Sequence, residues 1–91
     1  MSSIGIDPYE ARSTAATFES NQFAIEDSLN TMMSSVSRLL STWNGQSRMR
    51  FESEWEQWVQ RLRAMMDELQ SLANGLRREA DEFEESARSF G

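Results

Sequence analysis

Carboxylate side chains are the residues of this chain whose types and spacing could do chemistry. Three glutamates lie at alternate positions in residues 52–56, and four acidic residues lie within residues 81–85. Grouped carboxylates bind metal ions or, where burial shifts a pKa, act as general acids and bases. The chain contains no His and no Cys, which removes the usual general base and most transition-metal ligands. Long helices side by side offer no cleft to desolvate the acids, so we expect solvated helix faces, no enzyme and no cofactor.

The overall charge narrows the classes of partner. The chain has 91 residues and a net charge of −6, and all nine cations are Arg. An acidic chain without a basic stripe argues against nucleic acid and against anionic membrane surfaces as partners. No stretch approaches the ~20 apolar residues that span a bilayer. The first eight residues lack the basic and apolar regions of a classical secretory signal.

The elements that carry these residues read as one all-α domain over residues 1–91. Residues 1–6 are small and uncapped, and we expect a flexible arm. Asp7 and Pro8 suit the cap and the first turn of a helix over residues 8–42. An apolar stripe in steps of four and three predicts helix-to-helix packing along this segment. Its candidate core residues are Phe18, Ile25, Leu29, Met32, Val36 and Leu39.

Trp43-Asn44-Gly45 separates this stripe from a second one. Asn-Gly favours a turn, because Gly adopts positive φ without steric cost and Asn tolerates it. We therefore place a turn at residues 43–45, with Trp43 as an aromatic clamp at the closed end of a helical hairpin.

The second helix is predicted from residue 46 to 83 or beyond. Its candidate core residues are Phe51, Trp55, Trp58, Leu62, Met65, Leu69, Leu72 and Leu76, with a second apolar line beside them at Val59, Met66, Ala73 and Ala80. Gly75 follows Asn74 but leaves the stripe in phase, so we interpret it as a glycine inside the helix. Acidic residues in the last turns oppose the helix dipole, so we expect a frayed tail over residues 84–91.

A short turn between two long helices makes them antiparallel. The hairpin has only two layers, and its apolar face is wider than one helix pair needs. The burial available within one copy does not comfortably offset the entropy of ordering so many residues. We therefore predict a dimer that forms a four-helix bundle, and favour a homodimer over pairing with a paralogous hairpin.

The Trp-x-Gly turn near the middle of a cysteine-free, all-helical chain of about this length resembles the WXG-motif (ESAT-type) family. Phe51, eight residues after Trp43, matches the aromatic that often follows the motif. The resemblance implies a small bacterial protein secreted through the type VII (ESX) system, a non-classical route. It also implies recognition by an FtsK/SpoIIIE-type ATPase, escort of a larger effector, and a role for the turn in a composite export signal.

The family's C-terminal export signal, Tyr-x-x-x-Asp/Glu, is degenerate here, because the only Tyr of the chain is Tyr9. Phe83 stands in the aromatic slot, but Ala87 occupies the acidic one. Tyr9 and Phe23 lie off the stripe of the first helix, so they either contact the dimer partner, which we favour, or form an exposed docking patch. Two alternatives to a secreted substrate also stay open: a non-secreted cytoplasmic adaptor and, less favoured because the chain is acidic, a membrane-active effector.

Overall fold

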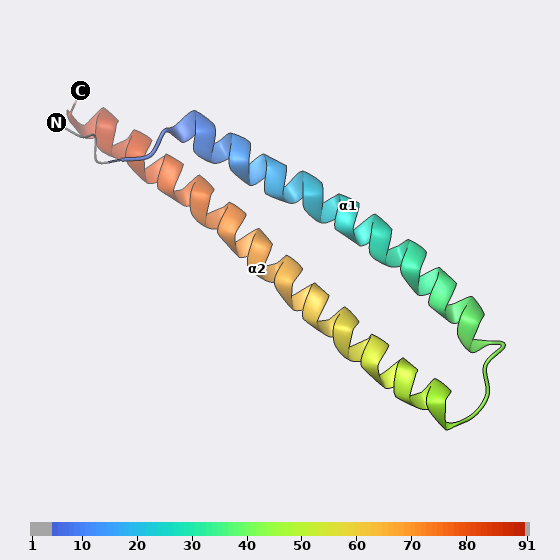
Figure 1. The fold of residues 1–91 in the computed structure, drawn as a ribbon. Helices are drawn as coiled ribbons and strands as arrows, with labels where there is room; N and C mark the ends of the chain where they lie inside the picture. The colour runs from blue at the N-terminus through green and yellow to red at the C-terminus, as the bar shows by residue number, and fades with distance from the viewer. Residues whose placement is uncertain (1–4, 91) are drawn as a thin grey trace.

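Residues 5–90 are described by a computed structural model, and they form two antiparallel helices joined by a short turn (Figure 1). Helix α1 spans Pro8–Leu40 and helix α2 spans Gln46–Phe90. The hairpin measures 69 × 20 × 18 Å, so it is a rod with no central core. The predicted fold of two long helices without strands is confirmed for the described residues. Neither helix contains a segment long and apolar enough to cross a membrane.

Local sequence explains where α1 begins and ends. The Asp7 carboxylate accepts hydrogen bonds from the backbone N–H groups of Tyr9 (2.9 Å) and Glu10 (3.2 Å), which satisfies two free donors of the first turn. At the other end, the hydroxyls of Ser41 and Thr42 donate to backbone carbonyls three residues earlier. These bonds close the last turn, so α1 ends at Leu40 and not at the predicted residue 42.

The turn covers residues 41–45, with Gly45 as the one positive-φ residue (φ 110°) among those described. Only the glycine of the Asn-Gly pair therefore needs the unusual backbone conformation. Helix α2 continues without interruption through Asn74 and Gly75. The glycine inside the helix was predicted from the unbroken stripe.

Residues 84–90, where we expect a frayed tail, are assigned to α2, which continues to Phe90. Two groups of contacts hold this end in place. Arg12 of α1 binds Asp81 and Glu84 across the hairpin, and Arg88 pairs with Glu85 on the helix itself. The expected flexible arm lies mostly in residues 1–4, which are outside the described part. Its last residues, Gly5 and Ile6, lie beside α2, because a Cβ built at Gly5 would be 2.6 Å from Cδ1 of Phe83.

The line of closest helix contact differs from the predicted one on α2. The buried hydrophobic residues are Ala11, Ala15 and Leu29 of α1 with Met66, Ala73 and Ala80 of α2. Three of these lie on the second apolar line of α2, which was expected to be the flank. On α2, the strip that contacts α1 is therefore bordered by that line on one side. On its other side are the half-buried Trp55, Leu62, Leu69 and Leu76. Small alanines at the contact let the helices approach closely, whereas the bulkier Trp58, Met65 and Leu72 stay outside.

Candidate protein-binding surfaces

One long edge of the hairpin, which we call the polar edge, is held by polar contacts at seven-residue intervals. It comprises Arg12, Glu19, Glu26 and Met33 on α1 with Arg63, Gln70, Arg77 and Glu84 on α2. Every seventh residue of a packed helix returns to nearly the same face. Because the helices are antiparallel, the first of one series faces the last of the other.

The strongest contacts of the polar edge lie towards the open end. Arg77 donates two hydrogen bonds to the Glu19 carboxylate, at 2.5 and 2.7 Å, and the Gln70 amide donates a third at 2.9 Å. These bonds, with that from Arg77 first, lower the pKa of Glu19 to about 2. Hydrogen bonding from Arg12 likewise lowers the pKa of Glu84. Arg63 and Glu26 are 3.6 Å apart, which is an ion pair without a close hydrogen bond.

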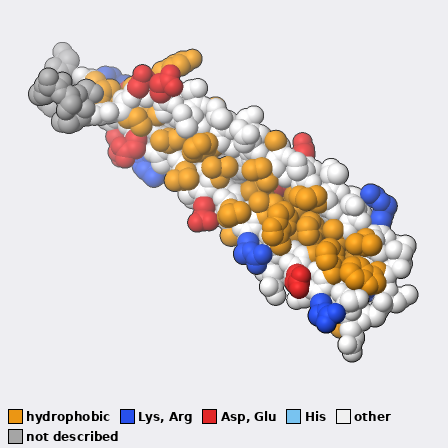
Figure 2. All heavy atoms as spheres, viewed as in Figure 1, with side chains coloured by type: hydrophobic (Ala, Val, Ile, Leu, Met, Phe, Trp, Pro, Cys, Tyr) orange, Lys and Arg blue, Asp and Glu red, His pale blue; other side chains and the backbone are white. Residues whose placement is uncertain are grey.

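The opposite side of the hairpin, the apolar face, has no such cover. Successive residues of a helix point about 100° apart. On α1, the residue that precedes each member of the polar edge therefore lies on the other side of the line along which the two helices touch. The apolar face comprises Ile25, Met32 and Leu39 of α1 with Trp58, Met65 and Leu72 of α2. Apart from the half-buried Ile25, these side chains are between 38% and 60% exposed. Figure 2 shows apolar side chains forming a nearly continuous band from the middle of the rod towards the turn.

The closed end of the hairpin is an aromatic cluster. Trp43 is half-buried and packs against Phe51, with ring centroids 5.6 Å apart. Trp55 and Trp58 stack at 5.4 Å with an angle of 17° between their planes. Trp58 belongs to the apolar face, so this cluster extends that face to the turn. Asn44 and Gly45 are exposed, and no atom lies within 4 Å of a Cβ built at Gly45.

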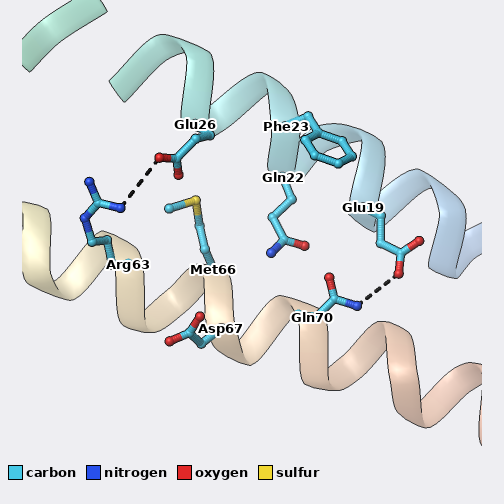
Figure 3. Close-up of a pocket in the computed structure, with 8 residues that line it drawn as sticks. All are labelled: Glu19, Gln22, Phe23, Glu26, Arg63, Met66, Asp67 and Gln70. Atoms are coloured by element: carbon cyan, nitrogen blue, oxygen red, sulfur yellow. Dashed lines mark hydrogen bonds and ion pairs between the residues drawn. The ribbon is translucent and has the colours of Figure 1, made fainter. Parts of the chain in front are cut away.

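A pocket of about 520 Å³ opens on the polar edge (Figure 3). We call it the Phe23 pocket, after the ring at its rim, which is 75% exposed. Its lining residues are Glu19, Gln22, Phe23, Glu26, Arg63, Met66, Asp67 and Gln70. Helix α1 lies above α2 in both Figure 1 and Figure 3, but it runs left to right in Figure 1 and right to left in Figure 3. The two figures therefore view the hairpin from opposite sides. Figure 2 has the same view as Figure 1, so the pocket is on the face opposite the apolar band of Figure 2.

The candidate site residues are thus divided among these surfaces. Leu29 is buried in the hairpin, and Phe18, Ile25, Val36, Phe51, Trp55, Leu62, Leu69 and Leu76 are half-buried. Phe23 lies on the rim of its pocket, while Tyr9 is 76% exposed near the start of α1. Phe83, 38% exposed, lies against Gly5. Sequence reasoning missed the polar edge, although the seven-residue spacing of its charged residues was a usable signal.

The acidic clusters of residues 52–56 and 81–85 have different surroundings. Asp81 and Glu84 are bound by Arg12, at 2.7 and 2.6 Å. Glu52 lines a second hollow near the turn, whereas Glu54 is exposed. Among the described residues, no three acidic side chains are grouped closely enough to hold a metal ion.

The fold and the turn together define a class of protein: a small helical hairpin with a Trp-x-Gly motif at its closed end and an uncovered apolar face. The chain belongs to the WXG100 family, described as proteins of 100 residues with WXG, whose family model matches residues 3–86.

Solved structures with the same fold come from Bacillus anthracis str. Sterne. The chain is 25% identical to the secreted protein EsxB, with a TM-score of 0.81 over 91% of this chain and 89% of that one. A glycine-to-alanine variant of EsxB is also 25% identical, with a TM-score of 0.78 over 93% and 98% of the two chains. No curated protein matches the sequence.

Proposed function

We propose that this protein is a substrate or carrier of a type VII (ESX) secretion system and works by binding other proteins, not by catalysis. Two observations support the proposal: membership of the WXG100 family and the similarity to EsxB, which is described as a secreted protein. The observation that carries the binding role is the apolar face, which the hairpin leaves uncovered.

The amount of apolar surface that one hairpin buries is small. Among the described residues, only Leu29 and Met66 are large buried hydrophobic side chains, and the others are alanines. Met65 and Leu72, 57% and 60% exposed, lie on one face with Trp58 and Met32. Contiguous exposed apolar side chains of this kind mark protein interfaces. The apolar face is therefore the dimer interface, and two copies packed through it form a four-helix bundle.

As the partner in the bundle, we favour a second copy of this chain over a paralogous hairpin. In either case the paired molecule presents the turn, with Trp43 and Gly45, to an FtsK/SpoIIIE-type ATPase and escorts a larger effector. Phe83 contributes a degenerate C-terminal signal, so export in company with a signal-bearing partner fits the sequence better than autonomous export.

Export is tested in the bacterium that carries the gene, with and without the ATPase of its type VII system. The protein is expected in the culture medium of the first strain only, while a cytoplasmic marker stays inside the cells of both. A variant with Leu72→Glu on the apolar face is expected to be retained, because pairing precedes export. Retention of the wild-type protein in both strains would contradict the proposal and favour a non-secreted adaptor.

A further inference from the structure

The Phe23 pocket has more hydrogen-bond acceptors than the hairpin supplies donors for. The side-chain oxygen of Gln22 is buried and has no hydrogen-bond partner among the described residues. The Glu26 carboxylate is 3.6 Å from Arg63, whose other nitrogen contacts the sulfur of Met33 at 3.9 Å. Asp67, also in the lining, is exposed and takes part in no ion pair among the described residues. An incoming donor would meet acceptors that are unpaired or weakly paired.

The charge of the pocket selects the kind of donor. Its lining holds three carboxylates, Glu19, Glu26 and Asp67, against one cation, Arg63. Glu19 is already bound by Arg77 from outside the pocket. The net charge of the chain is −6, so the surrounding field also attracts cations. A positively charged side chain therefore complements the pocket, and an anionic or neutral one does not.

The aromatic rim selects among cations. Phe23 is 75% exposed, so one side of its ring is open to a ligand. A guanidinium group is planar, stacks on aromatic faces and directs several N–H donors in its own plane. In Figure 3, Gln22 extends from α1 into the space between the helices, with Phe23 and Glu26 beside it on the same helix. A guanidinium stacked on Phe23 would thus have the Glu26 carboxylate as a neighbour, and rotation of the Gln22 amide would expose its buried oxygen as a second acceptor.

From these observations we propose that the Phe23 pocket binds an arginine side chain of a separate partner protein. The pocket opens on the face opposite the apolar face, so it stays accessible when two hairpins pair. The four-helix bundle consequently has a second kind of interface, polar and specific for an arginine-bearing segment. This inference does not depend on export or on pairing, since every residue of the pocket belongs to one hairpin.

The test uses the full chain and two small probes, followed by amide and side-chain NMR shifts. Nα-acetyl-arginine amide carries the guanidinium, and Nα-acetyl-citrulline amide is its neutral counterpart of nearly the same shape. The arginine probe is expected to give saturable shifts confined to residues 19–26 and 63–70, including the Gln22 side-chain amide. Because charge and several donors are needed, the citrulline probe is expected to bind several-fold more weakly.

Variants separate the pocket from general attraction to an acidic protein. Phe23→Ala is expected to weaken binding of the arginine probe roughly 2–5-fold, the range of an exposed cation–π contact. Tyr9→Ala is the matched control, an equally exposed aromatic on the same helix outside the pocket lining, and is expected to change nothing. Shifts that are absent, spread over all acidic residues, equal for citrulline or unchanged in Phe23→Ala would overturn the inference. Sedimentation of the same samples reports pairing separately.

Discussion

Substituting alanine for Gly45 or for Gly75 is expected to change the free energy of unfolding in opposite directions. At Gly45 the φ angle of 110° is costly for any residue with a Cβ, although the added atom would touch nothing within 4 Å. Gly45→Ala is therefore expected to lower the free energy of unfolding by about 1–3 kcal/mol through backbone strain alone. Gly75 is helical, and its Cβ would make an ordinary 3.7 Å contact with Arg78. Gly75→Ala is expected to raise the free energy of unfolding by about 0.4–1 kcal/mol. Urea unfolding of both variants tests these two expectations. Changes of the same sign in the two variants would contradict them.

Glu19 gives the hairpin a defined response to acid. Its pKa in the folded chain is about 2, below its ordinary value of 4.5, because Arg77 and Gln70 donate hydrogen bonds to the carboxylate. The lowered value means that the unfolded chain takes up the proton first as pH falls. The contribution of Glu19 to stability is therefore complete above pH 4.5 and is lost as pH falls towards 2.

The urea midpoint measured as a function of pH tests this account of Glu19. Glu19→Gln is expected to lower the midpoint at neutral pH and to flatten its fall between pH 4.5 and 2. Glu54→Gln is the control, since Glu54 is exposed and forms no ion pair among the described residues, and it is expected to follow the wild-type curve. A Glu19→Gln curve as steep as that of wild type would show that Arg77 does not stabilise the fold through this carboxylate.

Features that depend on a few neighbouring residues could be predicted from sequence. The turn follows from Asn-Gly between two stripes, and the continuity of α2 at Gly75 follows from the unbroken four-residue step to Leu76. The contacts of Glu19 could not be predicted, because they depend on how far one helix is shifted along the other. That shift places Arg77, far away in sequence, opposite Glu19.

At the scale of the elements, the phase of α2 shows why a wide apolar stripe is ambiguous. Three apolar lines run along this helix, through Trp58, through Leu62 and through Met66. Any two neighbouring lines could form the contact with α1. The sequence places the contact on the stripe that includes Trp58, Met65 and Leu72, but the residues of α2 that are fully buried are Ala73 and Ala80. Close helix approach favours small residues at the contact, and the bulkier Trp58, Met65 and Leu72 remain exposed.

The C-terminal end of α2 depends on one long-range clamp. Arg12 holds Asp81 and Glu84, while beyond Glu85 the helix has few contacts with α1 to oppose the unfavourable dipole interaction of its acids. Amide hydrogen exchange is therefore expected to show protection up to about residue 84 and faster exchange over 86–90. Arg12→Ala is expected to move the start of fast exchange back towards Asp81.

Arg63→Ala serves as the control for this clamp, because it removes a cation of the same polar edge far from the C-terminal end. It is expected to leave exchange over residues 81–90 unchanged. Equal protection of residues 81–90 in wild type and Arg12→Ala would contradict the clamp, and fast exchange from residue 81 in wild type would show that the clamp does not hold.

At the scale of the whole molecule, we propose that the two faces of the rod serve two different binding roles. The polar edge joins α1 to α2 and carries the Phe23 pocket, while the apolar face has no counterpart within the hairpin. Surface ion pairs contribute little each, so the polar edge mainly fixes the alignment of the helices. We propose that a partner buries the apolar face, and a second hairpin offers a surface of matching length and composition.

Pairing through the apolar face is the central claim, and sedimentation equilibrium of the purified chain at micromolar concentration tests it most directly. The account predicts a species of twice the 10.5 kDa chain mass for wild type and for Phe23→Glu, whose substitution is on the opposite face. We expect a 10.5 kDa monomer for Leu72→Glu, which places a charge on the apolar face. A folded wild-type monomer, or a Leu72→Glu variant that still dimerises, would contradict it.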